Sequence, residues 1–223
     1  MKVVLLPGMD GTGILFEPFI EQAPPDIEIT TIPLMPSENY SYEDHARYVM
    51  SQIGEDPVTV VAESYSGMVA YNMLRLGCKN IEHVVFAASF ICLPSKPARI
   101  ANYFPVALAR SKLVPKTLMG KILFGKFSSP KLINYFYSAL SMTGDKTLTH
   151  RLDQIAKLKE PKYKINIPCT YIKPDSDIAV SKAAVTAFHK VCSNLIIHEV
   201  AGTHFVLQTN PKGCWQLIMR AHV

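Results

Sequence analysis

The 223-residue sequence contains no run of about twenty apolar residues free of charge, so it predicts no helix that crosses a membrane. The apolar stretch at its start ends at Pro7 and Gly8, which is too early for the core of a signal peptide and is typical of a strand. We therefore expect a cytoplasmic protein.

Paired cysteines and metal-binding motifs are missing as well. The five cysteines are odd in number and widely spaced, and they form neither a CxxC pair nor a Cys/His spacing that suits a metal ion. They are Cys78, Cys92, Cys169, Cys192 and Cys214. We expect buried, reduced thiols, which fit a reducing compartment. Residues 11–13, Gly-Thr-Gly, lack the third glycine and the downstream acid of a dinucleotide site, so we predict neither a cofactor nor a metal ion.

Charged residues are few and unevenly placed. They make up 18% of the chain, against 48% hydrophobic residues, which predicts a well-buried core in one domain. The net charge of +5 conceals a segment, residues 95–164, that holds 14 Lys and Arg against three acids, while the remainder holds 9 against 15. The basic segment has no recognised nucleic-acid-binding motif and the rest is acidic, so we expect no binding to nucleic acid.

Short apolar runs alternate with amphipathic stretches along most of the chain. The runs are unbroken and rich in β-branched residues, which is typical of strands buried on both faces of a parallel sheet. The expected strands are 3–6, 27–32, 58–62, 83–90, 168–173 and 194–200. The expected helices are 42–53, with Ser41 as its N-cap, 68–76, 130–140, 147–158, 182–191 and 212–221. This order predicts an α/β fold, with a mostly parallel sheet of about six strands and helices on both faces.

Residues 95–164 interrupt the alternation. The segment has no strand pattern, includes two of the expected helices and is punctuated by prolines. We predict a helical lid insertion over one edge of the sheet, with residues 1–94 and 165–223 forming the core.

A serine lies between the third expected strand and the helix that follows it, in the sequence A-E-S-Y-S-G of residues 62–67. Small residues flank it at minus two and plus two, as a nucleophile turn requires, because larger ones would collide with the neighbouring strand or helix. Such a turn holds its serine in a strained conformation. It resembles the nucleophile turn of the α/β-hydrolase superfamily, G-x-S-x-G, with Ala62 and Ser66 in place of the two glycines.

The resemblance extends over nearly the whole chain and implies an α/β-hydrolase fold with a reduced sheet and Ser64 as nucleophile. It places one oxyanion-hole N–H at Met9, in the Gly-containing loop after the first strand, and the other at Tyr65. Pro7 stands where many relatives have histidine. Serine at position 64 excludes the haloalkane and epoxide chemistries of the superfamily, which use an aspartate nucleophile.

His204 is the candidate general base. It follows the last expected strand, and loops at the carboxyl ends of parallel strands share one rim of the sheet, where His204 can face Ser64. Its imidazole can accept the serine proton and later return it, because its pKa is near neutrality. We expect the other six histidines to have surface or packing roles. They are His45, His83, His150, His189, His198 and His222.

A carboxylate that orients the imidazole should lie between nucleophile and base in chain order. Asp175 and Asp177 both follow the fifth expected strand. Members of the family commonly have valine three residues after this acid, and Val180 has that spacing from Asp177. The resemblance therefore favours Asp177, with Asp175 as the alternative.

These residues favour a serine esterase that cleaves a carboxylic ester through an acyl-enzyme intermediate. We expect the insertion to line an apolar acyl pocket. Its candidate residues are Phe104, Leu108, Leu113, Leu118, Phe124 and Phe127. A basic lid above a serine esterase resembles the methyl ester esterases that act on pimeloyl-acyl carrier protein in biotin synthesis, which implies an acidic acyl carrier protein as partner.

Two other functions stay open. Residues 107–127 interleave lysine and arginine with leucine and phenylalanine, a composition typical of a segment that lies on an anionic membrane. That pattern would indicate an interfacial lipase or lysophospholipase. Since a fold does not guarantee activity, a catalytically silent binding protein is the third possibility, although the complete set of Ser64, Asp177 and His204 argues against it.

Overall fold

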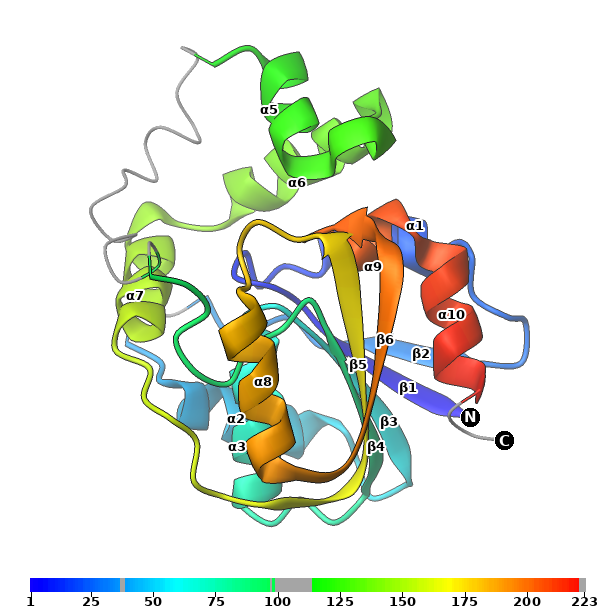
Figure 1. The fold of residues 1–223 in the computed structure, drawn as a ribbon, viewed down its shortest axis with the longest axis vertical. Helices are drawn as coiled ribbons and strands as arrows, with labels where there is room; N and C mark the ends of the chain where they lie inside the picture. Colours follow the sequence, from blue (N-terminus) through cyan, green and yellow to red (C-terminus); the bar gives the residue numbers. More distant parts are fainter. Residues whose placement is uncertain (37–38, 97, 99–113, 221–223) are drawn as a thin grey trace.

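The computed structural model describes residues 1–36, 39–96, 98 and 114–220, and a six-stranded sheet forms the centre of these residues (Figure 1). The strands are β1 (Lys2–Leu6), β2 (Glu28–Thr31), β3 (Val58–Glu63), β4 (Ile81–Ala87), β5 (Ile165–Ser176) and β6 (Cys192–Thr203). Their order is β2-β1-β3-β4-β5-β6, and each neighbouring pair is parallel. The predicted α/β fold with a parallel sheet of about six strands is confirmed.

The central strands are buried on both faces because their side chains alternate between two hydrophobic cores. In β1, Val4 and Leu6 belong to one core, while Val3 and Leu5 belong to the other. The first core is covered by α2 (Tyr42–Gln52), α3 (Ser66–Arg75) and α8 (Lys182–Val191). The second is covered by η1 (Ile14–Phe16), α1 (Glu17–Ile20), α9 (Val206–Thr209) and α10 (Pro211–Arg220). Helices therefore lie on both faces of the sheet (Figure 1).

The single tryptophan fixes α10 to the second core. The Trp215 ring stacks on Phe19, with 4.3 Å between the ring centroids and 2° between the ring planes. Its Nε1 donates a hydrogen bond to the Phe19 carbonyl, 2.7 Å away. This contact joins the last helix of the chain to α1.

Local chemistry sets several element boundaries. Ser41 caps α2 as predicted and forms a capping box with Asp44. Strand β4 ends three residues earlier than predicted, because Ala88 has a φ of 45°, a left-handed conformation that interrupts an extended chain. Strands β5 and β6 instead continue three residues further than predicted, to Ser176 and Thr203.

The middle of the chain adds helices above the carboxyl ends of the strands (Figure 1). They are α5 (Lys116–Phe124), the short η3 (Gly125–Phe127), α6 (Pro130–Met142) and α7 (Asp145–Ala156). Helices α5 and α6 approach closely at Gly120, where a Cβ would lie 2.4 Å from Cδ1 of Ile133. Phe124 and Ile133 belong to a third, small core, against which Phe205 packs from the loop after β6.

All five cysteines are free thiols. Four of them are buried, but Cys78, in the turn after α3, is half-buried, so the expectation that all five lie inside is wrong at that position. Within the described ranges, no helix is long and apolar enough to cross a membrane.

Candidate active site

Ser64 occupies the turn between β3 and α3 and has a φ of 48°. This left-handed conformation costs a residue with a side chain about 1–3 kcal/mol, and it turns the serine out of the line of the strand. The turn depends on Gly67, where a Cβ would lie 2.0 Å from Oγ of Ser89 and 2.9 Å from the carbonyl oxygen of Phe90. The strained turn expected from the sequence is present, and its tightest contact is at Gly67.

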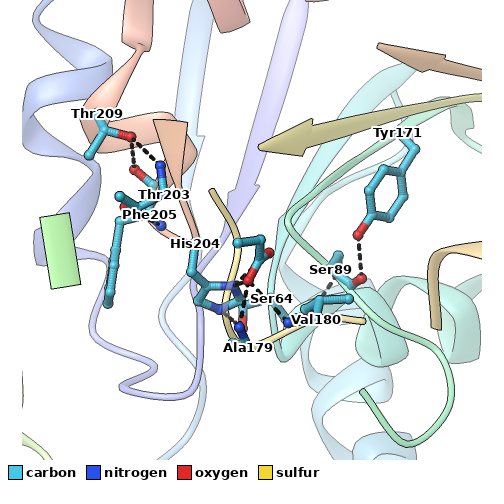
Figure 2. A network of polar contacts seen from close by, with 10 residues as sticks. Ser64, Ser89, Tyr171, Ala179, Val180, Thr203, His204, Phe205 and Thr209 are labelled. Atoms are coloured by element: carbon cyan, nitrogen blue, oxygen red, sulfur yellow. Dashed lines mark hydrogen bonds and ion pairs between the residues drawn. The ribbon is translucent and has the colours of Figure 1, made fainter. Parts of the chain in front are cut away.

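A chain of hydrogen bonds joins Ser64, His204 and Asp177. Oγ of Ser64 lies 2.8 Å from Nε2 of His204 (Figure 2). Nδ1 of His204 lies 3.1 and 3.2 Å from the two carboxylate oxygens of Asp177. An ionised carboxylate only accepts hydrogen bonds, so Nδ1 carries the ring proton. Nε2 is then left to accept the hydrogen of the Ser64 hydroxyl.

Asp177 is held by its own loop. One carboxylate oxygen accepts hydrogen bonds from the N–H groups of Ala179 and Val180, at 2.8 and 3.0 Å, and the side chain is only 7% exposed. Burial alone would raise the pKa of Asp177, but the hydrogen bond from His204, the charge of that residue and the two N–H groups lower it overall. The carboxyl group is therefore ionised at neutral pH and orients the imidazole.

Asp175, the alternative acid, is directed elsewhere. It is exposed, and its carboxylate accepts hydrogen bonds from the N–H of Gly202 at 3.1 Å and from the Ser176 hydroxyl at 2.9 Å. These bonds lower its pKa. Of the two aspartates, the structure brings Asp177 to His204.

His204 is more basic than an ordinary histidine. Burial would lower its pKa, but the hydrogen bond and charge of Asp177, together with the charge of Glu63, raise it overall. A more basic imidazole draws the proton from a hydroxyl more readily. The geometry thus allows proton transfer from Ser64 to His204 as the serine oxygen attacks.

Glu63, which sequence analysis missed, is a second carboxyl group at the site. It ends β3 directly before Ser64, is 4% exposed, and has one carboxyl oxygen without a partner among the described residues. Burial raises the pKa of Glu63 to about 7, the nearby charge of Asp10 acts in the same direction, and Gln208 opposes it. An acidic residue directly after an unbroken apolar strand was the signal that could have found it.

The expected oxyanion donor at Met9 is oriented by its peptide group. The carbonyl of Gly8 accepts a hydrogen bond from the N–H of Gly11, 3.0 Å away. The Gly8–Met9 peptide is trans, so its N–H points opposite to that carbonyl. Among the described residues, the Met9 N–H has no acceptor and is free to bind a ligand oxygen.

The expected donor at Tyr65 is fixed in the same way. The carbonyl of Ser64, in the peptide that carries this N–H, accepts a hydrogen bond from Oγ of Ser89 at 2.7 Å. It also accepts one from the N–H of Gly67 at 3.1 Å. Ser89 is itself held, because its carbonyl accepts from the Tyr171 hydroxyl at 2.8 Å. Sequence analysis placed Ser89 inside a strand and gave it no role.

A cavity of about 490 Å³ opens beside Ser64 and His204. Most of its wall is apolar, and the helices above the sheet contribute Ile122, Leu123, Phe136, Leu140, Leu148 and Leu152. Among the described residues that line the cavity, the ionisable ones are Asp10, Glu63 and His204, and none is a lysine or arginine. The cavity suits an uncharged, apolar group.

The predicted lining residues of α5 and η3 are wrong. Leu118 is 50% exposed to solvent, Phe124 is buried in the small core between α5 and α6, and Phe127 does not line the cavity. Their neighbours Ile122 and Leu123 line it instead. The other three candidates, Phe104, Leu108 and Leu113, lie outside the described residues. Helix α5 carries apolar residues around most of its circumference, so its sequence does not reveal which face is turned inward.

Within the described ranges, His204 is the only histidine that lines the cavity beside Ser64. His45 and His83 are buried, and burial lowers the pKa of His45 to about 4. His150 contacts the carbonyl of Tyr40. Over the described ranges, no group of three or more His, Cys, Asp or Glu side chains is placed to hold a metal ion.

No family model and no curated protein matches this sequence. Solved structures match its fold closely. An esterase from Exiguobacterium antarcticum superposes with a TM-score of 0.83 and 13% identity, over 100% of this chain and 92% of the other. A bromoperoxidase from Bacillus anthracis superposes with a TM-score of 0.79 and 19% identity, over 99% of this chain and 91% of the other. An enol-lactonase from Burkholderia xenovorans superposes with a TM-score of 0.78 and 11% identity, over 99% of this chain and 90% of the other.

The chain has the α/β-hydrolase fold. In this fold, the loops after β1, β3, β5 and β6 meet at one rim of the sheet and bring Met9, Ser64, Asp177 and His204 together. Identities this low show the fold alone, so the reaction has to be inferred from the site.

Proposed function

We propose that this chain is a serine hydrolase that cleaves a carboxylic ester through an acyl-enzyme intermediate. The observation that carries the proposal is the hydrogen-bond chain from Ser64 through His204 to Asp177, beside two oriented N–H groups. A nucleophile next to a base that a third group orients is the arrangement that acyl transfer needs. Two structural neighbours are named as an esterase and an enol-lactonase, which supports an ester as the bond cleaved.

The proposed reaction uses these groups in turn. Oγ of Ser64 attacks the ester carbonyl carbon while its proton passes to Nε2 of His204. The oxyanion that forms accepts hydrogen bonds from the N–H groups of Met9 and Tyr65. The ester C–O bond then breaks, and His204 gives the proton to the departing alcohol. Water repeats the sequence on the acyl-enzyme, which releases the acid and restores Ser64.

The acyl group of the substrate occupies the cavity between the sheet and helices α5 to α7. Its apolar wall stabilises a hydrocarbon chain, and its acidic groups, Asp10 and Glu63, disfavour an acyl chain that ends in a carboxylate. The substrate is therefore an ester of an uncharged, apolar acyl group.

The finer proposal is that this acyl group is attached to an acidic acyl carrier protein and bears a methyl ester. It is supported by three exposed lysines, Lys116, Lys121 and Lys126, in the segment α5–η3 that also contributes Ile122 and Leu123 to the cavity wall. A second candidate is action on lipid at an anionic membrane, because the same helix exposes Leu118 and Ile122, at 50% and 52%.

The esterase proposal is tested with p-nitrophenyl esters of increasing acyl length and with a fluorophosphonate probe. We expect hydrolysis and labelling by the wild type, and loss of both in Ser64→Ala. Ser51→Ala, which changes an exposed serine on α2, is the matched control and should behave as wild type. Labelling that persists in Ser64→Ala would place the nucleophile elsewhere. A folded wild type that neither reacts nor labels would indicate a silent binding protein.

The two surface proposals are separated by binding at low salt. Acyl carrier protein and vesicles with or without anionic lipid are mixed with the wild type and with the double variant Lys121→Glu/Lys126→Glu. The proposed carrier function predicts binding to the acidic protein that this variant loses and that Lys79→Glu, on the turn after α3, retains. Binding to anionic vesicles alone would favour the membrane candidate.

A further inference from the structure

Arg151, on helix α7, contacts the loop after β1 that carries the Met9 N–H. The side chain is 1% exposed, and its two terminal nitrogens donate to the carbonyls of Met9, at 2.7 Å, and Met35, at 3.0 Å. Room for it exists because residue 11 is glycine, with a φ of 74°. A Cβ there would lie 2.3 Å from Nη1 of Arg151. The loop and the guanidinium group are therefore fitted to one another.

The Met9 carbonyl lies in the central peptide of a tight turn. The Gly8 carbonyl accepts from the Gly11 N–H, so Met9 and Asp10 are the two central residues of that turn. Types I and II of such a turn differ by a flip of this central peptide, and both keep the hydrogen bond from the fourth N–H to the first carbonyl. Arg151 holds the carbonyl of Met9, the residue that carries the donor N–H, and so restrains the backbone directly after that donor.

A second residue of α7 holds the other donor. The hydroxyl of Tyr65 donates to Oε1 of Gln154 at 2.5 Å, and Nε2 of Gln154 donates to the Tyr40 carbonyl at 2.7 Å. Tyr65 is fully buried, and the Arg151 guanidinium lies over its ring, 5.7 Å from the centroid. Arg151 and Gln154 are three residues apart, so they share one face of α7.

We propose that Arg151 and Gln154 are positioning residues that fix the two oxyanion donors, which makes the reactivity of Ser64 depend on the docking of α7. This inference rests on the proposed function. Within the described ranges, neither residue lines the cavity, so each acts through the donor it contacts and not on the substrate. Loss of one oxyanion donor lowers kcat by about 10²–10³, so a donor that is present but misoriented should lower it by roughly 10–100-fold.

Arg151→Met, Arg151→Lys and Gln154→Leu are compared with Lys157→Met, which changes an exposed residue at the end of the same helix. For the first three, we expect kcat to fall with KM changed less than about threefold. Affinity for an alkyl trifluoromethyl ketone, whose adduct with Ser64 carries the same oxyanion, should fall in proportion to kcat/KM. Arg151→Lys should retain part of the activity. A folded Arg151→Met or Gln154→Leu with wild-type kcat and ketone affinity would overturn the inference.

Because Arg151 is buried, its variants can fail to fold, and a double-mutant cycle keeps the inference testable. Tyr65→Phe keeps the main-chain N–H but removes the hydroxyl that bonds Gln154. If that bond orients the donor, Tyr65→Phe, Gln154→Leu and the double variant should lower kcat by about the same factor. Additive losses, or no loss, would overturn it. Failure of the esterase proposal is seen separately, as a wild type that the fluorophosphonate does not label.

Discussion

Asp175 accepts a hydrogen bond from the N–H of Gly202, 3.1 Å away, and so ties the end of β5 to the end of β6. Asp177 and His204 each follow two residues later. The two aspartates thus have different roles, because Asp175 joins the ends of the two strands and Asp177 contacts the imidazole of His204.

A pair of asparagine variants tests this division. Asp177→Asn should lower kcat by about 10⁴-fold, because the amide no longer holds the required imidazole tautomer. Asp175→Asn keeps an oxygen for the Gly202 N–H and should change kcat less than about threefold. Steady-state kinetics on both variants, with thermal melts to show that each is folded, makes the comparison. Equal losses in the two would contradict the assignment of Asp177.

The pH dependence of kcat/KM should reflect the raised pKa of His204. The base is active when neutral, so activity is lost as pH falls through that pKa, and the midpoint should lie above about 6.5, the value for an ordinary histidine. Asp177→Asn removes the negative charge beside His204, so the midpoint of the pH profile of its residual activity should be lower than that of the wild type. Profiles measured between pH 5 and 9 decide the point, and a midpoint below 6.5 in the wild type would contradict it.

Glu63 should make the protein less stable as the pH rises. Its carboxyl has a pKa of about 7 in the folded state against 4.5 as the ordinary value, so the folded state binds the proton more tightly. Stability is then lost as pH rises from about 4.5 to 7, by about 3 kcal/mol in total. Glu63→Gln, which carries no charge, should be more stable than wild type at pH 8 and nearly equal at pH 4.5. Urea unfolding at both pH values measures this, and a gap that does not grow with pH would count against it.

Gly67→Ala should disrupt the nucleophile turn. The added methyl group would lie 2.0 Å from Oγ of Ser89 and 2.9 Å from the Phe90 carbonyl, so the turn must shift, at a cost of about 2–3 kcal/mol of stability. The hydrogen bond from Ser89 that orients the Tyr65 N–H would be lost with it, and kcat should fall.

Gly144→Ala is the control for that substitution. Residue 144 has a φ of −66°, and a Cβ there would come no closer than 3.7 Å to another residue, so the change should remain within about 1 kcal/mol. Denaturant melts of both variants give the comparison. If the two lose equal stability, close packing at Gly67 is not what holds the turn.

The sequence predicted those features that depend on local patterns. Strand β3 was recognisable because burial on both faces demands an unbroken apolar run. Ser64 was found from the small residues of its turn, and His204 from its place after a strand at the same rim. The preference for Asp177 over Asp175 came from the resemblance to the α/β-hydrolase superfamily, through the valine three residues later. The end of β4 was misplaced because the left-handed turn at Ala88 has no glycine to mark it.

Features that depend on distant contacts could not be predicted in the same way. Arg151 lies 142 residues from the carbonyl that it holds, and nothing near it in the sequence marks it as different from the other basic residues of its segment. Ser89 likewise acts on Ser64 from the end of a neighbouring strand. The cavity wall was wrong at Leu118 and Phe124 because a helix packed on more than one side has no single apolar stripe.

The placement of Trp215 gives the molecule a spectroscopic asymmetry. Its indole is stacked on Phe19 in the second core, while helices α5, α6 and α7 contain no tryptophan. Intrinsic emission therefore monitors the β1/α10 side during denaturation and is insensitive to whether those three helices detach first. Circular dichroism at helical wavelengths registers both parts, so a helical signal that falls before the emission changes would reveal their separate release.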